Sequence, residues 1–233
     1  MKEIAVVGAG IVGICTAYFL QKSGFKVTII DKEDPGSMTS FGHACTFADY
    51  ASIPVNSPSL LGQIPSMLFK RDSPLAIDFF YLIRNLPWAL KFLKNCRQDK
   101  VEEIAKSLAN FLKHSQLSYD EIFKEVKVSE YIKNKENIYL FDSKKAYDDY
   151  KYATLIRKNN NVEVIELNKN QIFDLEPNLA PVYYSGQLFV GSRHTTNPLA
   201  ISNKIFESFL SKGGEYIKEN VKNVKQKNNS VEI

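Results

Sequence analysis

The sequence predicts an α/β fold that begins with a parallel βαβ unit, and three observations carry this prediction. Residues 2–7 end in an apolar run that is typical of a strand. This run leads directly into a loop of the form G-x-G-x-x-G at residues 8–13, which is followed by a helical pattern. A second apolar strand, residues 26–30, ends at Asp31. This order of elements is typical of a Rossmann-like dinucleotide-binding unit.

The glycine loop has the residue types that a pyrophosphate requires. Gly8 permits a tight turn, Gly10 allows the backbone to approach the phosphates, and Gly13 allows the helix to pack closely on the strand. Free N–H groups at the start of the helix then face the phosphates. We therefore predict that the backbone of the whole loop binds the cofactor. Its residues are Gly8, Ala9, Gly10, Ile11, Val12 and Gly13.

Asp31 and the neighbouring Lys32 are predicted to lie at the adenosine end of the cofactor. A carboxylate at the end of the second strand can accept hydrogen bonds from the ribose hydroxyl groups. An acid at this position disfavours a 2′-phosphate and therefore disfavours NADP. These residues alone leave FAD and NAD open.

Residues 4–20 carry no charged side chain, which is also a property of signal peptides and membrane anchors. The stretch contains three glycines and only one basic residue, Lys2, precedes it. It is also short for a membrane span, which needs about 20 residues. We therefore interpret it as strand, loop and helix.

The composition limits the class of protein. The 233 residues, 44% of them hydrophobic, suffice for one large or two small domains. The net charge of +4 is spread along the chain, so no nucleic-acid partner is expected. The cysteines and histidines are too scattered for a metal site and include no C-x-x-C pair, which favours a reducing, cytoplasmic compartment. They are Cys15, Cys45, Cys96, His43, His114 and His194.

The rest of the chain divides into a loop, a helical region and a mixed region. Prolines and glycines predict a long loop over residues 32–57, and a helical period covers residues 59–126. The strands predicted beyond residue 136 are 137–141, 162–167, 186–191, 221–225 and 230–233, and the helices are 143–158, 168–176 and 197–212. Capping signals mark two of these helices: Asn168 with Gln171, and Asn197 with Pro198.

The segment from Phe79 to Leu93 is apolar on more than one face, and Pro87 is expected to divide or kink it. The favoured interpretation is a helix buried between neighbours. The alternative is a helix at a membrane surface, with Arg84, Lys91 and Lys94 as its basic side. This alternative would place the protein peripherally at the inner face of the cell membrane.

Several segments point to a known family. Thr39–Cys45 reads T-S-F-G-H-A-C, and Ser73–Ile77 reads S-P-L-A-I. The further runs are Leu86-Pro87-Trp88, Leu175-Glu176-Pro177 with Leu179, and the stretch from the last helix through Gly213-Gly214 to Val221. Together they resemble the FAD-dependent D-amino-acid oxidase/dehydrogenase family, most closely its bacterial D-amino-acid dehydrogenase branch. In that family a T-S-x-x-N-A-G segment passes the flavin, and the dehydrogenases carry S/A-P-L-x-I.

This resemblance implies an FAD-binding βαβ unit with an inserted helical region and a partial mixed-sheet substrate domain. It implies FAD rather than NAD as the cofactor. Thr39 and Ser40 would then lie near the pyrophosphate or the ribityl chain. His43 and Ala44 would lie toward the flavin ring, and Val221 would contact the adenine from a strand.

The resemblance also implies a reaction, the oxidative deamination of D-amino acids. A hydride passes from the α-carbon to the flavin, and water hydrolyses the resulting imino acid to a 2-oxo acid and ammonia. The electrons then go to a quinone or another acceptor in the dehydrogenases and to oxygen in the oxidases, and the sequence does not decide between them. The alternative among flavoenzymes is a glycine or sarcosine oxidase-like amine oxidase.

Two positions depart from the family pattern. His43 stands where the dehydrogenases usually carry asparagine, and Cys45 where they usually carry glycine. A histidine beside the flavin can stabilise a reduced, anionic ring, or it can simply bond the loop backbone. Cys45 is interpreted as a small packing residue rather than as a redox or flavin-attachment site.

The family's chains are longer than this one, and the resemblance is to their N-terminal half. The arginine that binds the substrate carboxylate lies in the other half, so the catalytic residues are left unknown. Arg193 and His194 are the candidates here, and the alternative interpretation is a solvated strand end and its cap. An inactive, truncated dinucleotide-binding fragment is the alternative to an enzyme, and residues 1–233 alone are expected to hold FAD weakly and to turn over no D-amino acid. The expected segments are 1–57 (FAD binding), 58–135 (helical), 136–197 (partial substrate domain) and 198–233 (FAD binding).

Overall fold

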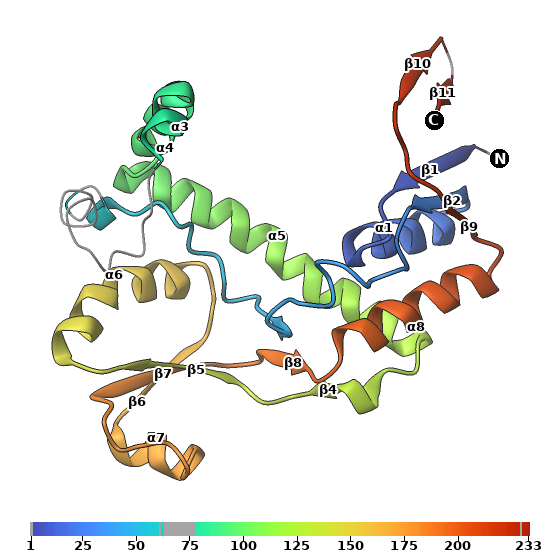
Figure 1. The fold of residues 1–233 in the computed structure, drawn as a ribbon. Helices are drawn as coiled ribbons and strands as arrows, with labels where there is room; N and C mark the ends of the chain where they lie inside the picture. The colour runs from blue at the N-terminus through green and yellow to red at the C-terminus, as the bar shows by residue number, and fades with distance from the viewer. Residues whose placement is uncertain (1, 61, 63–77, 229) are drawn as a thin grey trace. The chain divides into compact units, whose positions relative to one another are not determined.

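The computed structural model describes residues 2–60, 62, 78–228 and 230–233. The chain forms two compact units, which we call unit 1 and unit 2 (Figure 1). Unit 1 comprises Met1–Phe47, Leu117–Lys135 and Arg193–Ile233, and unit 2 comprises Ala48–Gln116 and Glu136–Ser192. The division into four segments stays a prediction, and the motif at 73–77 lies outside the described residues.

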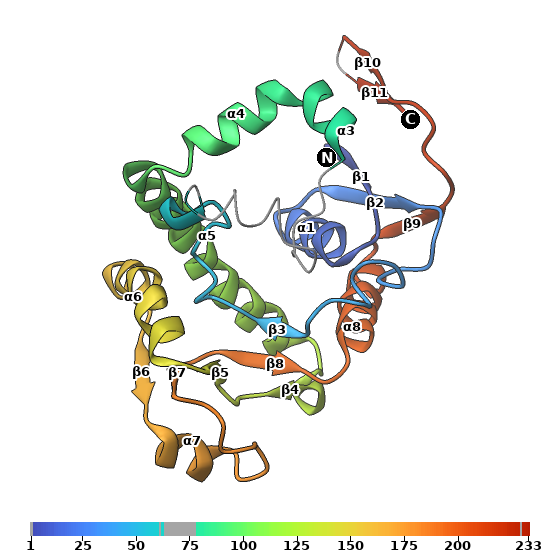
Figure 2. The same cartoon turned by 60° about the vertical axis from the view of Figure 1, so that its left-hand side comes forward.

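Unit 1 is built on a parallel sheet whose strand order is β1-β2-β9. The strands are β1 (Glu3–Val7), β2 (Lys26–Asp31) and β9 (Glu215–Lys218). The helices α1 (Ile11–Lys22) and α8 (Pro198–Ser211) lie side by side in Figures 1 and 2, and both pack on β2. Their shared core contains Ala17, Val27, Ile29 and Phe209. The predicted βαβ unit is therefore confirmed.

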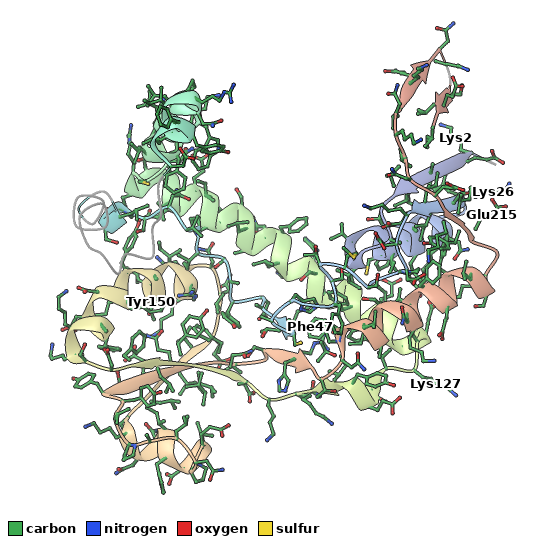
Figure 3. The ribbon with its side chains drawn as sticks, viewed as in Figure 1. Lys2, Lys26, Phe47, Lys127, Tyr150 and Glu215 are labelled. Carbon is green, nitrogen blue, oxygen red and sulfur yellow. The ribbon has the colours of Figure 1, made fainter. Side chains whose placement is uncertain are left out.

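The three strands are also joined by charged side chains at their amino ends. Lys26 Nζ lies 3.2 Å from a carboxylate oxygen of Glu3 and 3.5 Å from one of Glu215 (Figure 3). Such exposed pairs contribute about 0–1 kcal/mol each, so the apolar core accounts for most of the stability of the sheet.

A second, antiparallel sheet of unit 1 has the order β3-β8-β4. Its strands are β3 (Thr46–Phe47), β8 (Arg193–Thr195) and β4 (Ile132–Lys133), and β4 follows the 3₁₀ turn η1 (Ser129–Tyr131). Phe47 and Ile132 pack against a core that includes Ile14, Ile122 and Ile205. The hairpin of β10 (Lys225–Lys227) and β11 (Ser230–Glu232) completes the unit, and its first strand begins later than the predicted residue 221.

Unit 2 contains the antiparallel sheet β5-β7-β6 and several helices. The strands are β5 (Asn137–Phe141), β6 (Val164–Leu167) and β7 (Ser185–Phe189), and the helices are α3 (Phe79–Arg84), α4 (Leu86–Lys94), α6 (Lys144–Asn159) and α7 (Lys169–Leu175). The helix α5 (Gln98–Glu125) belongs to unit 2 up to Gln116 and to unit 1 beyond it. The predicted capping box is confirmed, because Asn168 and Gln171 bond each other's backbone N–H groups.

Two expectations, one about residues 32–57 and one about residues 79–93, are wrong. The predicted loop 32–57 contains the strand β3, because residues 46–47 pair with β8. The division expected at Pro87 is confirmed, because the segment forms α3 and α4, but the burial expected over 79–93 is wrong, because α4 has no buried residue. Trp88 is 66% exposed and Phe80 is 84% exposed. Asn85 ends α3, and Pro87 stands in the first turn of α4, where its missing N–H costs nothing.

Candidate cofactor-binding site

The glycine loop joins β1 to α1 in a conformation that requires glycine at two positions. Gly8 has φ +108°, a left-handed value that other residues rarely adopt. A Cβ atom on Gly13 would lie 1.9 Å from the carbonyl oxygen of Gly8. The tight turn expected at Gly8 and the close packing expected at Gly13 are therefore confirmed. Ala9 between them is almost fully buried.

Asp31 is held against this loop at the carboxyl end of β2. Its Oδ2 accepts a hydrogen bond of 2.6 Å from the N–H of Ala9, and its Oδ1 accepts one of 2.9 Å from the N–H of Glu33. Burial raises the pKa of Asp31, but the N–H groups of Ala9, Glu33 and Lys32 outweigh it and hold this pKa below its ordinary value. Because a carboxylate has about four acceptor positions, it can still accept from a ribose hydroxyl group.

Ser40 brings a hydroxyl group to the start of α1. The helix begins after Gly10, which has no side chain to cap it, and the N–H of Ile11 donates a hydrogen bond of 2.8 Å to Ser40 Oγ. A Cβ on Gly10 would lie 3.2 Å from that oxygen, so the glycine leaves room for Ser40. The serine hydroxyl accepts here and remains able to donate to a phosphate oxygen. Thr39 beside it is exposed, as is Val12 at 78%.

A tyrosine that the sequence analysis did not single out supports the chain after Asp31. The hydroxyl of Tyr216 on β9 donates to the carbonyl oxygen of Glu33 at 2.6 Å. Lys218, also on β9, forms an ion pair of 2.6 Å with Asp34. The alternating run E-Y-I-K directly after Gly213-Gly214 is the signal that could have identified this strand and its side chains.

Val221 lies beyond the strand on which it was expected. β9 ends at Lys218, and Val221 belongs to the irregular stretch before β10, so its placement on a strand is wrong. It does line an open hollow of about 500 Å³ that reaches Ile30 on β2 and Ile217 on β9. The carboxyl ends of parallel strands are where α/β sheets place their ligands. Val221 as an adenine contact stays a prediction.

The end of the 39–45 loop (Thr39–Cys45) is organised by His43. Its Nδ1 accepts a hydrogen bond of 2.9 Å from the N–H of Cys45, which leaves Nε2 to carry the ring proton. Cys45 has φ +62°, the left-handed region that favours glycine, the residue that the resembling family usually carries there. His43 therefore has a local backbone partner, while it and Ala44 remain exposed.

Arg193 and His194 lie on opposite faces of the β3-β8-β4 sheet. Directly paired residues share a face, so Arg193 lies with Phe47 on the core side and His194 lies with Thr46 and Lys133 on the other side. Arg193 is only 13% exposed and forms an ion pair of 2.7 Å with Asp120. The solvated strand end is therefore wrong for Arg193, because its guanidinium group lies over the rings of Phe47 and Phe123.

Neither a metal site nor a membrane span is present among the described residues. Among the residues that the structure describes, no three or more His, Cys, Asp or Glu side chains gather closely enough to hold a metal ion. Within the same residues, no helix is both long and apolar enough to span a membrane.

Comparison with known proteins identifies relatives of two kinds. The chain is 28% identical over 233 residues to a D-amino-acid oxidase from Bradyrhizobium diazoefficiens, a match that covers 99% of this chain and 55% of the relative. It is 32% identical over 119 residues to a D-amino acid dehydrogenase from Helicobacter pylori, covering 51% of this chain and 28% of the relative. Almost all of this chain matches the curated oxidase, but the chain spans only about half of that oxidase's length.

Solved structures show the same fold. An L-α-glycerophosphate oxidase from Mycoplasma pneumoniae with FAD bound matches with a TM-score of 0.65 and 16% identity, covering 99% of this chain and 49% of that protein. The family described as FAD dependent oxidoreductase (DAO) matches residues 3–233. The structural match confirms the predicted α/β fold, and the family match confirms the predicted FAD cofactor. With its glycine loop, Asp31 and nearly its whole length inside this match, the chain belongs to the FAD-dependent oxidoreductase family.

Proposed function

We propose that unit 1 holds FAD along the line from Ser40 to Asp31. The observation that carries this proposal is that Ser40 and Asp31 both bond the backbone of the glycine loop. The pyrophosphate would lie on the N–H groups at the start of α1, where the helix dipole favours negative charge. The ribose would bond the free acceptor positions of Asp31, and Lys32 would lie beside it.

We infer that the 39–45 loop covers the cofactor from the ribityl chain to the flavin ring. Thr39 and Ser40 offer hydroxyl groups at one end, and His43 with Ala44 stands at the other. The fixed tautomer of His43 directs an Nε2–H donor outward, which is suited to a flavin oxygen that gains charge on reduction. Changing His43 to alanine should then shift the absorbance spectrum or the reduction potential of the bound flavin, whereas identical values would favour a purely local role.

We propose that the whole protein oxidises D-amino acids to 2-oxo acids and ammonia. The bound flavin supplies an acceptor for the hydride of the α-carbon. The task of the polypeptide is to hold the neutral amine and the α-carbon in line and to exclude water from the transfer. Support comes from the two relatives described above, a D-amino-acid oxidase and a D-amino acid dehydrogenase.

The cofactor part of this proposal is tested by titrating FAD into the purified chain and following flavin fluorescence, with NAD in a parallel titration. We expect the fluorescence of FAD to be quenched when FAD binds, and we expect NAD not to compete with FAD for the site. Retention of NAD with no affinity for FAD would contradict the proposal.

The substrate part is tested by adding D-alanine, glycine or sarcosine to the FAD-loaded whole protein, not to residues 1–233 alone, in the absence of oxygen. Bleaching of the flavin by D-alanine is the expected result. Bleaching by glycine or sarcosine alone would favour the amine-oxidase alternative. Binding of FAD without any bleaching would favour a dinucleotide-binding chain without activity of its own.

We also propose that α3 and α4 contact a membrane surface. Their exposed apolar side chains include Tyr81, Trp88 and Leu90, and the basic residues Arg84 and Lys91 are exposed beside them. A tryptophan with basic neighbours on a short helix is typical of interfacial binding. The protein should sediment with phosphatidylglycerol vesicles more than with phosphatidylcholine vesicles, and Trp88→Ser should lower sedimentation with both kinds of vesicle. Equal sedimentation of Trp88→Ser and the unaltered protein would contradict the proposal. A quinone acceptor and a cytoplasmic location at the inner membrane face stay predictions.

A further inference from the structure

The 39–45 loop is attached to unit 1 at both of its ends. At its start, Ser40 accepts the N–H of Ile11 at 2.8 Å. At its end, the N–H of Thr195 donates a hydrogen bond of 2.7 Å to the carbonyl oxygen of Cys45. The chain then continues into β3, where Phe47 pairs with Arg193 of β8. The position of His43 therefore depends on two separate attachments.

The attachment at the end of the loop is built around the guanidinium group of Arg193. Its central carbon lies 5.5 Å from the centre of the Phe47 ring and 5.7 Å from that of the Phe123 ring. Its Nη1 lies 2.7 Å from Asp120 Oδ1. Phe123 and Asp120 are both on α5, so one side chain links β3 and β8 to this helix. We call this group, Arg193 with Phe47, Asp120 and Phe123, the arginine clamp.

Two N–H donors of Arg193 lack an acceptor among the described residues, so the arginine clamp is not the arrangement that would give the highest folding stability. Nε and Nη2 are buried without an acceptor among the residues that the structure describes. A buried donor without a partner is destabilising, and apolar side chains of similar volume often replace buried ion pairs without loss of stability. A stacked cation with a charged partner does, however, fix the direction of a strand more narrowly than an apolar contact does, because its geometry is restricted.

We propose that Arg193 is a positioning residue that fixes the end of the 39–45 loop and, through it, the imidazole of His43. Arg193 acts through Phe47 and β8 and does not touch the cofactor. The inference rests on the proposed function, because the 39–45 loop matters for catalysis only if it lines the flavin.

The direct test is amide hydrogen exchange of the chain without cofactor. The Thr195 amide reports on the end of the loop and the Ile11 amide on its start. In Arg193→Met, which keeps the volume but removes the charge, the Thr195 amide should exchange about tenfold faster or more, while the Ile11 amide is unchanged. Ser40→Ala is the matched control and should give the opposite pattern, with faster exchange at Ile11 only.

Two further variants keep the test decisive if Arg193→Met fails to fold. Asp120→Asn removes only the charge of the partner, and Arg193→Lys keeps the cation but loses the planar group. Exchange at Thr195 should rise least in Arg193→Lys. Unchanged exchange at Thr195, or an equal rise at Ile11 and Thr195, in the folded variants would overturn the proposal.

The second readout is the spectrum of bound FAD. Arg193→Met should shift the flavin absorbance in the same direction as His43→Ala, and Arg193→Lys should restore part of the wild-type spectrum. If the unaltered chain binds no FAD, the proposed function fails, whereas the exchange result still decides whether the clamp holds the loop. If FAD binds and the spectra of Arg193→Met and the unaltered chain coincide, the clamp does not position His43.

Discussion

The helices α1 and α4 have similar apolar sequences and opposite environments. α1 buries Ile14, Ala17 and Tyr18, whereas α4 buries no residue at all. The difference lies in their neighbours, since α1 packs on β2 and α8 and its start is fixed by the glycine loop. An apolar helix is therefore placed by specific contacts at its ends and faces, and its hydrophobicity alone does not show what it packs against.

An ion-pair network adds to the contacts of α1. Glu125 on α5 lies 2.6 Å from Lys22 at the end of α1 and also pairs with Lys212, just beyond α8. Lys22 and Lys212 in turn lie over the ring of Tyr18, at 6.0 and 5.0 Å from its centre. The network thus joins three helices of unit 1 at one point, which isolated surface pairs do not do.

The largest expected effect is a difference between matched substitutions in the two helices. Ile14→Ala should lower the free energy of unfolding by about 2–5 kcal/mol, because Ile14 is fully buried in the core of unit 1. Leu90→Ala on α4, where the side chain is 58% exposed, should change it by about 0.5 kcal/mol or less. Urea denaturation measures both, and equal losses would show that α4 is covered in solution.

The contact that fixes the start of α1 should give the next largest effect. Gly13→Ala places a methyl group 1.9 Å from the Gly8 carbonyl oxygen, so the loop and helix must separate. We expect a loss of about 2–3 kcal/mol and a loss of FAD affinity. Gly42→Ala is the control for stability alone, because no atom beyond its chain neighbours lies within 4 Å of the added methyl group. A Gly13→Ala protein with unaltered stability would mean that the loop is more adaptable than its geometry indicates.

Asp31→Ala should affect both stability and cofactor affinity. Two backbone N–H groups lose a charged acceptor, so the free energy of unfolding should fall by about 2 kcal/mol. The affinity for FAD should fall about tenfold or more. Asp34→Ala, which removes an exposed acid paired with Lys218, is the comparison variant. FAD affinity that is equal in the two variants would exclude Asp31 as the ribose ligand.

The smallest expected effect is on the pH dependence of stability. Lys212 and Lys22 pair with Glu125 and lower its pKa in the folded protein to about 2. A folded pKa below the unfolded value means that this stabilisation is complete above about pH 4.5 and is lost as the pH falls toward 2. Because the carboxylate is partly exposed, we expect only about 1 kcal/mol. We expect the melting temperature of Glu125→Gln to change less between pH 5 and pH 2 than that of the unaltered chain. An equal pH dependence in the two proteins would contradict the stabilising role of the Glu125 ion pairs.

Local sequence patterns were sufficient to predict the structural features whose interacting residues are close in sequence. The turn at Gly8, the capping box at Asn168 and Gln171 and the start of α8 after Asn197 all depend on contacts within a few residues. The strand–loop–helix–strand order up to Asp31 is of the same kind. Hydrogen bonding and sterics over such short distances are encoded by residue type, so the pattern alone predicts them.

Contacts between distant segments could not be predicted in this way. Nothing in the run around Arg193 indicates that its guanidinium group lies between Phe47 and Phe123, because these residues are brought together by β-pairing and by α5. The same applies to Ser40 at the start of α1 and to Tyr216 behind Asp31. The amino-acid sequence by itself determined the βαβ unit and most helices and strands, and it predicted a dinucleotide as the cofactor. Only the tertiary structure decided which apolar faces are covered and which charges are buried, because burial depends on the partner that packs against a residue and not on the residue alone.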